Sequence, residues 1–372
     1  MSRAARSHVI VVAVIAVLAT GCTSASRPRL GSAPPSTPAT SSPSTPSSPP
    51  STRSAHPPAP PTGEFTFAFA GDVHFTERPA ALLADPETAF GPAAPALRRA
   101  DLAMVNLETA ITTRGTPAPK DFHFRTPSTA FTALRDAGID LATMANNHAA
   151  DYGSVGLSDT LSAIRTSHFP VVGIGPNADA AFAPWRTTVH GVKVAVIAAS
   201  QVRDETLANY SAGASSPGIA SADSDRLVSA VRAAKAAGYV VVVYLHWGIE
   251  FQDCPNGDQR GLADTLARAG VTAIIGTHVH VLQGAGWRPD GAYVAYGLGN
   301  YLWWRSFGNT QDDNGLLTLT FRHARVVAAG FTPSHLDSRG IPVPATGAEA
   351  SRINTQWAHV RTCAGLSAKP PA

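Results

Sequence analysis

The sequence predicts an α/β fold, in which strands and helices alternate through a single domain. The alternation begins abruptly at Glu64 and continues to about Phe321. Tyr239 to Leu245 is an unbroken apolar run, which is typical of a strand covered on both faces. Of the 372 residues, 44% are hydrophobic, which is ample for a globular core, and no internal repeat divides the chain.

Individual elements follow from periodicity and from capping residues. Strict alternation at residues 65–69 predicts the first strand. Ser128 is expected to cap a helix that ends at Gly138, and Gly238 is expected to end a later helix. We predict further strands at 102–105, 139–143, 192–199, 239–245, 272–275, 294–298 and 316–321, and helices at 128–136, 157–167, 223–237 and 258–269.

The regions on either side of this alternation differ from it in composition. Residues 23–63 are dominated by Pro, Ser and Thr and lack apolar periodicity, so they cannot bury enough surface to offset their chain entropy. We expect an extended, disordered linker there. The rhythm is lost again after about Ser334. The predicted domain therefore spans 64–335, followed by a C-terminal tail over 336–372.

The N-terminus has the pattern of an export signal. Arg3 and Arg6 precede an apolar run, Val9 to Ala19, that suits a signal peptide and is short for a membrane span. Cys22 follows a small residue and resembles the lipidated cysteine of bacterial lipoproteins. We therefore predict a lipoprotein signal peptide over 1–22 and a lipid-anchored protein on the extracytoplasmic side of a cell membrane. An ordinary cleaved signal with a chance cysteine is the alternative.

Two cysteines remain after the signal, Cys254 and Cys363. An exported chain meets an oxidising compartment, where an even pair favours a disulfide. Such a bridge would fasten the C-terminal tail beside the loop that follows His246. Two unrelated thiols are the alternative.

The charge balance excludes one class of partner. The formal net charge is only +3, and the basic residues form no stripe along the sequence. Nucleic-acid binding therefore has no electrostatic footprint in this chain.

Polar residues of one chemical kind follow five of the predicted strands. In open α/β sheets, sites form at the carboxyl ends of strands, so these five segments are expected to converge. The segments are Asp72-Val73-His74, Asn106-Leu107-Glu108, Asn146-Asn147-His148, His246-Trp247-Gly248 and His278-Val279-His280.

Imidazole, carboxylate and amide oxygen together suit Zn, Mn or Fe. In an Asp-x-His or His-x-His unit, alternate side chains lie on one side of an extended strand end. Each segment alone has a plain structural explanation, such as a turn or a helix cap. Five in order, each at a strand end, predict a metal centre, and two metals can clamp an in-line displacement at phosphorus.

In order and spacing, these motifs resemble those of the calcineurin-like metallophosphoesterases. Together with Asp151-Tyr152-Gly153, Gly248-Ile249-Glu250 and Gly297-Leu298-Gly299-Asn300, they resemble the CapA family, which is named for a poly-gamma-glutamate capsule biosynthesis protein. The resemblance covers about Glu64 to Phe321. It implies a metallophosphoesterase-like α/β/β/α sandwich with a single catalytic domain.

The resemblance also implies a role for each ligand. Two divalent ions (Mn, Fe or Zn) would be bound, the first by Asp72, His74 and His280 and the second by Asn147, His246 and His278. Glu108 stands where the superfamily usually has a bridging aspartate, and its extra methylene puts bridging in doubt. Many CapA members have an apolar residue at the position of His74, so this chain is closer to the full superfamily pattern.

His148 would face the substrate and protonate the leaving oxygen, with a hydrogen-bonded turn histidine as the alternative. Asp151 and Tyr152 are expected to brace the turn that follows it. Asn300 is a candidate for orienting or binding a ligand, and Glu250 is more typical of a structural residue paired with a histidine. Three tryptophans either wall the cleft or belong to the core and rim: Trp247, Trp303 and Trp304.

Three functions remain open at this stage. The first is a metal-dependent phosphoester hydrolase that acts on a cell-wall or capsular polymer. The second is a non-hydrolytic factor that exports, anchors or retains an anionic polymer such as poly-gamma-glutamate. The third is a binding module with a degenerate site, which the intact ligand set argues against.

Overall fold

The computed structural model describes residues 63–308 and 310–372. The predicted signal peptide with Cys22, and all of the predicted linker except Gly63, lie outside the described residues. Within the described part, no helix is both long enough and apolar enough to cross a membrane.

The first sheet is built around the N-terminal strand of the domain. Strand β1 (Glu64–Val73) pairs with a parallel strand on one side and, along residues 64–69, with an antiparallel strand on the other. The short strand β15 (Asn300–Leu302) pairs with the end of β1, where Asp72 is in register with Asn300. The remaining strands are β2 (Leu102–Leu107), β5 (Leu141–Thr143) and β6 (Val171–Val172) on the parallel side, and β16 (Asp313–Arg322), β17 (Arg325–Leu336) and β18 (Pro342–Pro344) on the antiparallel side.

The second sheet has a parallel centre with an antiparallel strand at each edge. Its order is β13 (Ala285–Trp287), β14 (Tyr293–Ala295), β12 (Ala273–Thr277), β11 (Val240–His246), β9 (Val192–Ser200) and β8 (Trp185–Val189). All seven residues of β11 are buried, as expected for the apolar run there. Burial on both faces explains why this strand carries no polar alternation.

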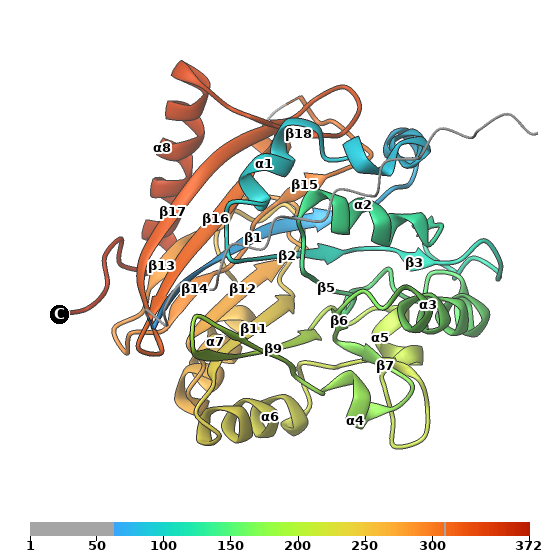
Figure 1. Ribbon diagram of the computed structural model, residues 1–372, viewed down its shortest axis with the longest axis horizontal. Coiled ribbons are helices and arrows are strands. Elements are labelled where there is room, and N and C mark those ends of the chain that lie inside the picture. Colours follow the sequence, from blue (N-terminus) through green and yellow to red (C-terminus); the bar gives the residue numbers. More distant parts are fainter. Residues whose placement is uncertain (1–62, 309) are drawn as a thin grey trace, which may run out of the picture. The chain divides into compact units, whose positions relative to one another are not determined.

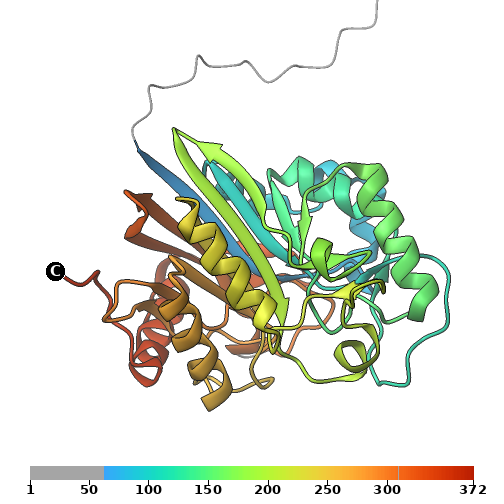
Figure 2. The ribbon, with the colours of Figure 1, turned by 90° about the horizontal axis from the view of Figure 1, so that it is seen from below.

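Three apolar clusters define the layers. One lies between the two sheets and includes Phe67 and Phe69 of β1 with Val242 and Tyr244 of β11. The second packs the first sheet against α1 (Ala94–Leu97), α2 (Thr129–Ala137) and α3 (Gly153–Ser167). The third packs the second sheet against α6 (Asp225–Ala236) and α7 (Gly257–Ala269), the two helices in front of that sheet in Figure 2. The order helix, sheet, sheet, helix confirms the predicted α/β/β/α sandwich (Figure 1).

Local sequence signals set the helix ends. The backbone of Gly138 is left-handed, with φ 86°, and ends α2 as predicted, whereas Ser128 stands at the N-cap without a capping hydrogen bond from its side chain. Helix α7 begins with a capping box formed by Asn256 and Gln259. Its start is thereby fixed directly after the loop that follows β11.

Residues 336–372 are not the peripheral tail that the sequence suggested. They complete β17, add β18 to the first sheet and form the helix α8 (Gly347–Ala364). Ile353, Trp357, Val360 and Ala364 form its buried face, and both terminal guanidinium nitrogens of Arg352 donate to the carboxylate of Asp313. The polar residues and alanines between these few anchors weaken the apolar period, which is why sequence reasoning missed the helix.

The structure joins Cys254 and Cys363 in a disulfide, with the Cα atoms 5.8 Å apart. The bridge connects the loop between β11 and α7 to the last turn of α8. It therefore fastens the C-terminal helix beside the segment that follows His246, as expected.

Replacing both cysteines with serine is expected to lower the free energy of unfolding by about 2–4 kcal/mol. The two sulfurs close a loop with a sequence separation of 109 residues, so the bridge removes much freedom from the unfolded chain. Urea denaturation of the oxidised protein and of the double variant measures the difference. Equal midpoints and slopes would show that the bridge contributes nothing to stability.

Candidate metal centre

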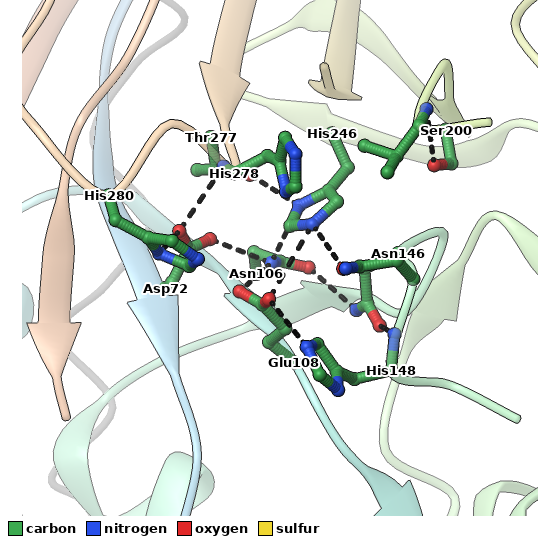
Figure 3. A network of polar contacts seen from close by, with 12 residues as sticks. Asp72, Asn106, Glu108, Asn146, His148, Ser200, His246, Thr277, His278 and His280 are labelled. Atoms are coloured by element: carbon green, nitrogen blue, oxygen red, sulfur yellow. Dashed lines mark hydrogen bonds and ion pairs between the residues drawn. The ribbon is translucent and has the colours of Figure 1, made fainter. Parts of the chain in front are cut away.

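The five predicted segments converge between the carboxyl ends of β1, β2 and β5 in the first sheet and of β11 and β12 in the second (Figure 3). All seven predicted ligands are at most 9% exposed: Asp72, His74, Glu108, Asn147, His246, His278 and His280. Buried polar side chains are normally hydrogen-bonded or hold an ion. Their contacts therefore show which of them can act together.

Asp72 is anchored at the centre of the group. Asn106 donates from Nδ2 to its Oδ1 at 2.7 Å, and the backbone N–H of His278 donates to Oδ2 at 3.2 Å. The Nδ1 atom of His280 lies 3.5 Å from the same Oδ2. Both carboxylate oxygens are thus held in fixed directions between the two sheets.

Glu108 has a buried carboxylate oxygen, Oε1, without any hydrogen-bond partner. This oxygen lies 3.6 Å from Nε2 of His246 and 3.7 Å from Nε2 of His148. Its second oxygen is 3.3 Å from Nδ2 of Asn106. An unpaired carboxylate oxygen in a buried site facing imidazole nitrogens is the environment that a divalent cation would satisfy.

His246 and His278 bring imidazoles from the second sheet, with ring centroids 4.7 Å apart. His246 Nε2 is 2.8 Å from Oδ1 of Asn147, and its Nδ1 is 3.1 Å from the hydroxyl of Thr277. The Nδ1 of His278 is buried and has no hydrogen-bond partner. The structure thus brings together the residues that the resemblance assigns to the second metal.

His280 is oriented by Asn300, whose Oδ1 lies 2.8 Å from the ring Nδ1. Because Oδ1 is an acceptor, Nδ1 carries the proton and Nε2 keeps the lone pair. Asn300 is fully buried. It therefore positions an imidazole, and binding of substrate by Asn300 stays a prediction.

His74 lies in an aromatic layer beside the cluster. Its ring stacks on Phe124 at 4.2 Å and meets Trp303 edge-on at 4.4 Å. The backbone N–H groups of Thr76 and Trp304 face its two ring nitrogens at 3.2 and 3.3 Å. A neutral imidazole has one lone pair, so it can accept only one of these two hydrogen bonds. Ligation by His74 stays a prediction, and the structure gives its nitrogens other neighbours.

His148 belongs to a chain of three polar side chains. Its Nδ1 lies 2.6 Å from Oδ2 of Asp151, and Lys120 Nζ lies 2.5 Å from the other oxygen of that carboxylate. Asp151 also accepts from the backbone N–H of Phe124, so it braces the turn as expected. With Nδ1 engaged, His148 directs Nε2 toward Glu108.

Sequence reasoning gave no role to Asn106, Thr277 or Lys120. Asn106 stands two residues before Glu108, so alternation along a strand end offered a signal for it, whereas Thr277 directly precedes the His278-x-His280 unit and had no such signal. Lys120 comes from a loop without any recognisable pattern. Trp247 is fully buried against Tyr296, which supports the core interpretation of that residue.

Burial sets the protonation of the site in the metal-free state. It raises the pKa of Glu108 well above its usual value, with the nearby charge of Asp72 as the next cause. It lowers the pKa of His246 and His278 well below 6.5, with neighbouring imidazoles adding to the effect. For His280, burial is outweighed by hydrogen bonding to Asp72 and by the charges of Asp72 and Glu250, so its pKa is raised. Neutral imidazoles are ready ligands, and a cation would displace the proton from Glu108.

The metal-free protein is expected to lose stability as the pH falls below 6.5. Burial lowers the pKa of four histidines, that of His148 to about 4: His74, His148, His246 and His278. Below pH 6.5 these histidines bind protons in the unfolded chain but not in the folded chain. The free energy of unfolding therefore falls by about 1.4 kcal/mol per pH unit for each histidine. Glu108 has the opposite effect and offsets the contribution of one histidine, because its raised pKa keeps a proton on the folded state. Urea titrations in EDTA between pH 4.5 and 7 measure the slope, and stability that is flat or rises toward pH 4.5 would contradict the assignment.

Two groups of side chains have ligand atoms within 4.8 Å of one another. One is Asp72, Glu108 and His280, and the other is Glu250, His278 and His280. Both sets combine carboxylate oxygen with imidazole nitrogen, which suits Mn, Fe or Zn. The described residues therefore fit divalent metal, and His280 is common to both groups.

Comparison with known proteins gives a consistent picture. The chain is 31% identical over 225 residues to the PGA biosynthesis protein CapA of Bacillus subtilis, which covers 59% of this chain and 57% of that protein. It is 30% identical over 244 residues to the capsule biosynthesis protein CapA of Bacillus anthracis, which covers 64% of this chain and 58% of that protein. A probable polyglutamine synthesis accessory protein of Mycobacterium tuberculosis is 29% identical over 48% of this chain and 50% of that protein. The matches thus span a little over half the length of the two Bacillus relatives.

A solved structure, that of TT1561 from Thermus thermophilus, superposes with a TM-score of 0.39 and 10% identity, over 70% of this chain and 99% of that one. A likeness this distant carries no argument for the fold, which rests on the two sheets and the helices packed against them. The model of the bacterial capsule synthesis protein family matches residues 66–303. These residues include every segment of the metal centre, and the chain therefore belongs to the bacterial capsule synthesis protein family.

Proposed function

We propose that this protein acts outside the cytoplasmic membrane in the biosynthesis of a capsular or cell-envelope polymer of the poly-gamma-glutamate type. We further propose that it does so by metal-dependent hydrolysis of a phosphoester. The names of the Bacillus relatives support the first part. The unpaired Oε1 of Glu108, buried among imidazole nitrogens, is the observation that carries the second.

When bound, two divalent ions would supply Lewis acidity and activate a water. Asp72, Glu108, Asn147, His246, His278 and His280 would hold them, with His74 as a seventh candidate. The protein fixes this set in advance, because Asn106 orients Asp72, Thr277 orients His246 and Asn300 orients His280. Such prior orientation of ligands lowers the cost of binding.

The proton for the leaving oxygen would come from His148. Asp151 accepts from Nδ1, so the ring is held with Nε2 toward the metal centre. Burial lowers the pKa of His148 to about 4, although Asp151 acts in the opposite direction. The negative charge of a bound phosphoester would favour the imidazolium and raise that pKa toward the range useful for a general acid.

Metal analysis and a phosphoester panel test this proposal on the purified protein. We expect two ions per chain after incubation with Mn²⁺ and release of nitrophenol from bis-(p-nitrophenyl) phosphate or p-nitrophenyl phosphate. EDTA should abolish the release, and Mn²⁺ should restore it. Two bound ions without any turnover would count against hydrolysis.

A non-hydrolytic role in polymer export or anchoring is the second candidate. It is favoured by the word "accessory" in the name of the Mycobacterium relative. A deletion strain distinguishes the two roles. If a His148→Ala chain that binds metal restores the surface polymer, the role is binding; if it fails while the wild type succeeds, the role is catalytic.

Membrane attachment through Cys22 is part of the proposal. A Cys22→Ser chain is expected to move from the membrane fraction to the soluble exported fraction. Radiolabelled fatty acid should be incorporated by the wild type alone. Unchanged membrane association of the variant, without label in the wild type, would instead indicate a different kind of anchor.

A further inference from the structure

Glu250 lies at the mouth of the metal centre, on the loop between β11 and α7. Its Oε1 is 4.0 Å from Nε2 of His280, and its side chain is 47% exposed. Ligand atoms of Glu250, His278 and His280 all lie within 4.8 Å of one another. The charge of Glu250 also helps raise the pKa of both His280 and Glu108. This carboxylate therefore acts on the centre electrostatically and has open space on its other side.

The loop that carries Glu250 is fastened to the His278-x-His280 segment. The backbone N–H of Phe251 donates to the carbonyl of Val279 at 2.8 Å. The carbonyl of Gln252 accepts from the side chain of Gln283, which is fully buried. The disulfide at Cys254 holds the same loop four residues beyond Glu250. Three attachments thus fix the backbone directly after Glu250, whose carboxylate lies near two imidazoles.

Two observations distinguish the ring nitrogens of His278 from those of His74. The Nδ1 of His278 is buried and has no hydrogen-bond partner, and His278 as a whole is only 5% exposed. Meanwhile both ring nitrogens of His74 face backbone N–H groups. In the group that includes Glu250, His278 therefore has an unsatisfied ring nitrogen, whereas both ring nitrogens of His74 already have backbone N–H neighbours.

We propose that Glu250 is a metal ligand, which completes an outer site with His278 and His280, and that it supplies the donor that the superfamily pattern would assign to His74. The inner site would then use Asp72 and Glu108, because the one free ring nitrogen of His280, Nε2, can bind only one ion. A partly exposed carboxylate on the outer ion leaves that ion open to solvent and to substrate. This inference rests on the metal centre of the proposed function and changes its ligand set.

Calorimetric titration with Mn²⁺ and with Zn²⁺, together with metal counting, tests the assignment. In Glu250→Gln we expect at least a tenfold loss of affinity at one of two sites, because even supporting residues cost about 10–100-fold when removed. His74→Phe, which keeps the aromatic layer, should bind two ions with wild-type affinity. Glu87→Gln, at an exposed glutamate in the 3-10 helix Pro86–Thr88, is the matched control.

The possible outcomes separate the two proposals. Wild-type affinity in Glu250→Gln, or loss of one ion in His74→Phe alone, would overturn the assignment of Glu250. A wild-type chain that binds no ion at all would instead overturn the proposed function. Glu250→Asp is expected to bind metal with intermediate affinity. The free energy of unfolding in EDTA should be the same for all Glu250 variants and the wild type, because an exposed carboxylate contributes little to stability. A large loss of stability in EDTA would show a structural role and count against ligation.

Discussion

Replacing His148 with alanine is expected to lower the turnover of a phosphoester substrate by about 10²- to 10⁴-fold, the range for removing a general acid. The structure gives His148 no hydrogen bond to the predicted ligands and places its Nε2 3.7 Å from Glu108. The variant should therefore keep two bound ions and an unchanged KM. Steady-state kinetics with Mn²⁺ and metal counting on the same sample measure the three quantities.

His359→Ala is the matched control, because this histidine is exposed on α8. It should keep wild-type turnover. A substrate with a good leaving group needs little protonation, so the loss in His148→Ala should be smaller for nitrophenyl esters than for alkyl esters. Turnover within a fewfold of wild type on both kinds of ester would show that His148 is a turn histidine and not the acid.

The sequence was sufficient to predict the layered fold because its elements follow simple periodic rules. The apolar run of β11 and the alternation at the start of β1 predict strands for physical reasons that hold in any α/β domain. The same rules place Asp72, Glu108 and His246 at strand ends. Within each sheet, parallel pairing then brings such strand ends to the same edge, without knowledge of any distance.

The C-terminal region could not be predicted in this way. Helix α8 is held by four buried side chains, an Arg352–Asp313 ion pair and the disulfide, all of which involve partners far away in sequence. A sequence pattern reports local periodicity and says nothing of such partners. The loss of rhythm after Ser334 therefore reflected weak amphipathicity, and not absence of structure.

The same limit explains what sequence reasoning missed within the site. Whether His74 points to a metal or into an aromatic layer depends on Phe124 and Trp303, which the fold alone brings beside it. Lys120 meets Asp151 only because its loop crosses the turn after His148. Glu250 follows His246 by only four residues, yet its neighbours are the two histidines at the end of another strand.

Replacing Asp72 with asparagine is expected to weaken metal binding by more than about 100-fold, beyond the cost of removing a supporting residue. Asparagine keeps the size of the side chain and one acceptor oxygen, for either Asn106 or the His278 amide, but it removes the charge. Turnover should fall with metal occupancy. Calorimetric titration with Mn²⁺ measures the affinity, and the variant should also lose the metal-dependent rise in stability, about 2.7 kcal/mol for the wild type at 100 times Kd.

In EDTA the same variant should lose much less stability than it loses free energy of metal binding. Burial and the charge of Asp72 both raise the pKa of Glu108, so in the metal-free protein the charge of Asp72 disfavours ionisation of Glu108. Replacing Asp72 with asparagine removes that charge, while the amide oxygen can keep only one of the two hydrogen bonds at 2.7 and 3.2 Å, because the amide nitrogen takes the place of the other acceptor. A large effect on metal affinity beside a small effect on metal-free stability is expected of a residue held in place for a cation. If Asp72→Asn unfolds more easily in EDTA and still binds metal, Asp72 is a structural acid and the centre has another ligand set.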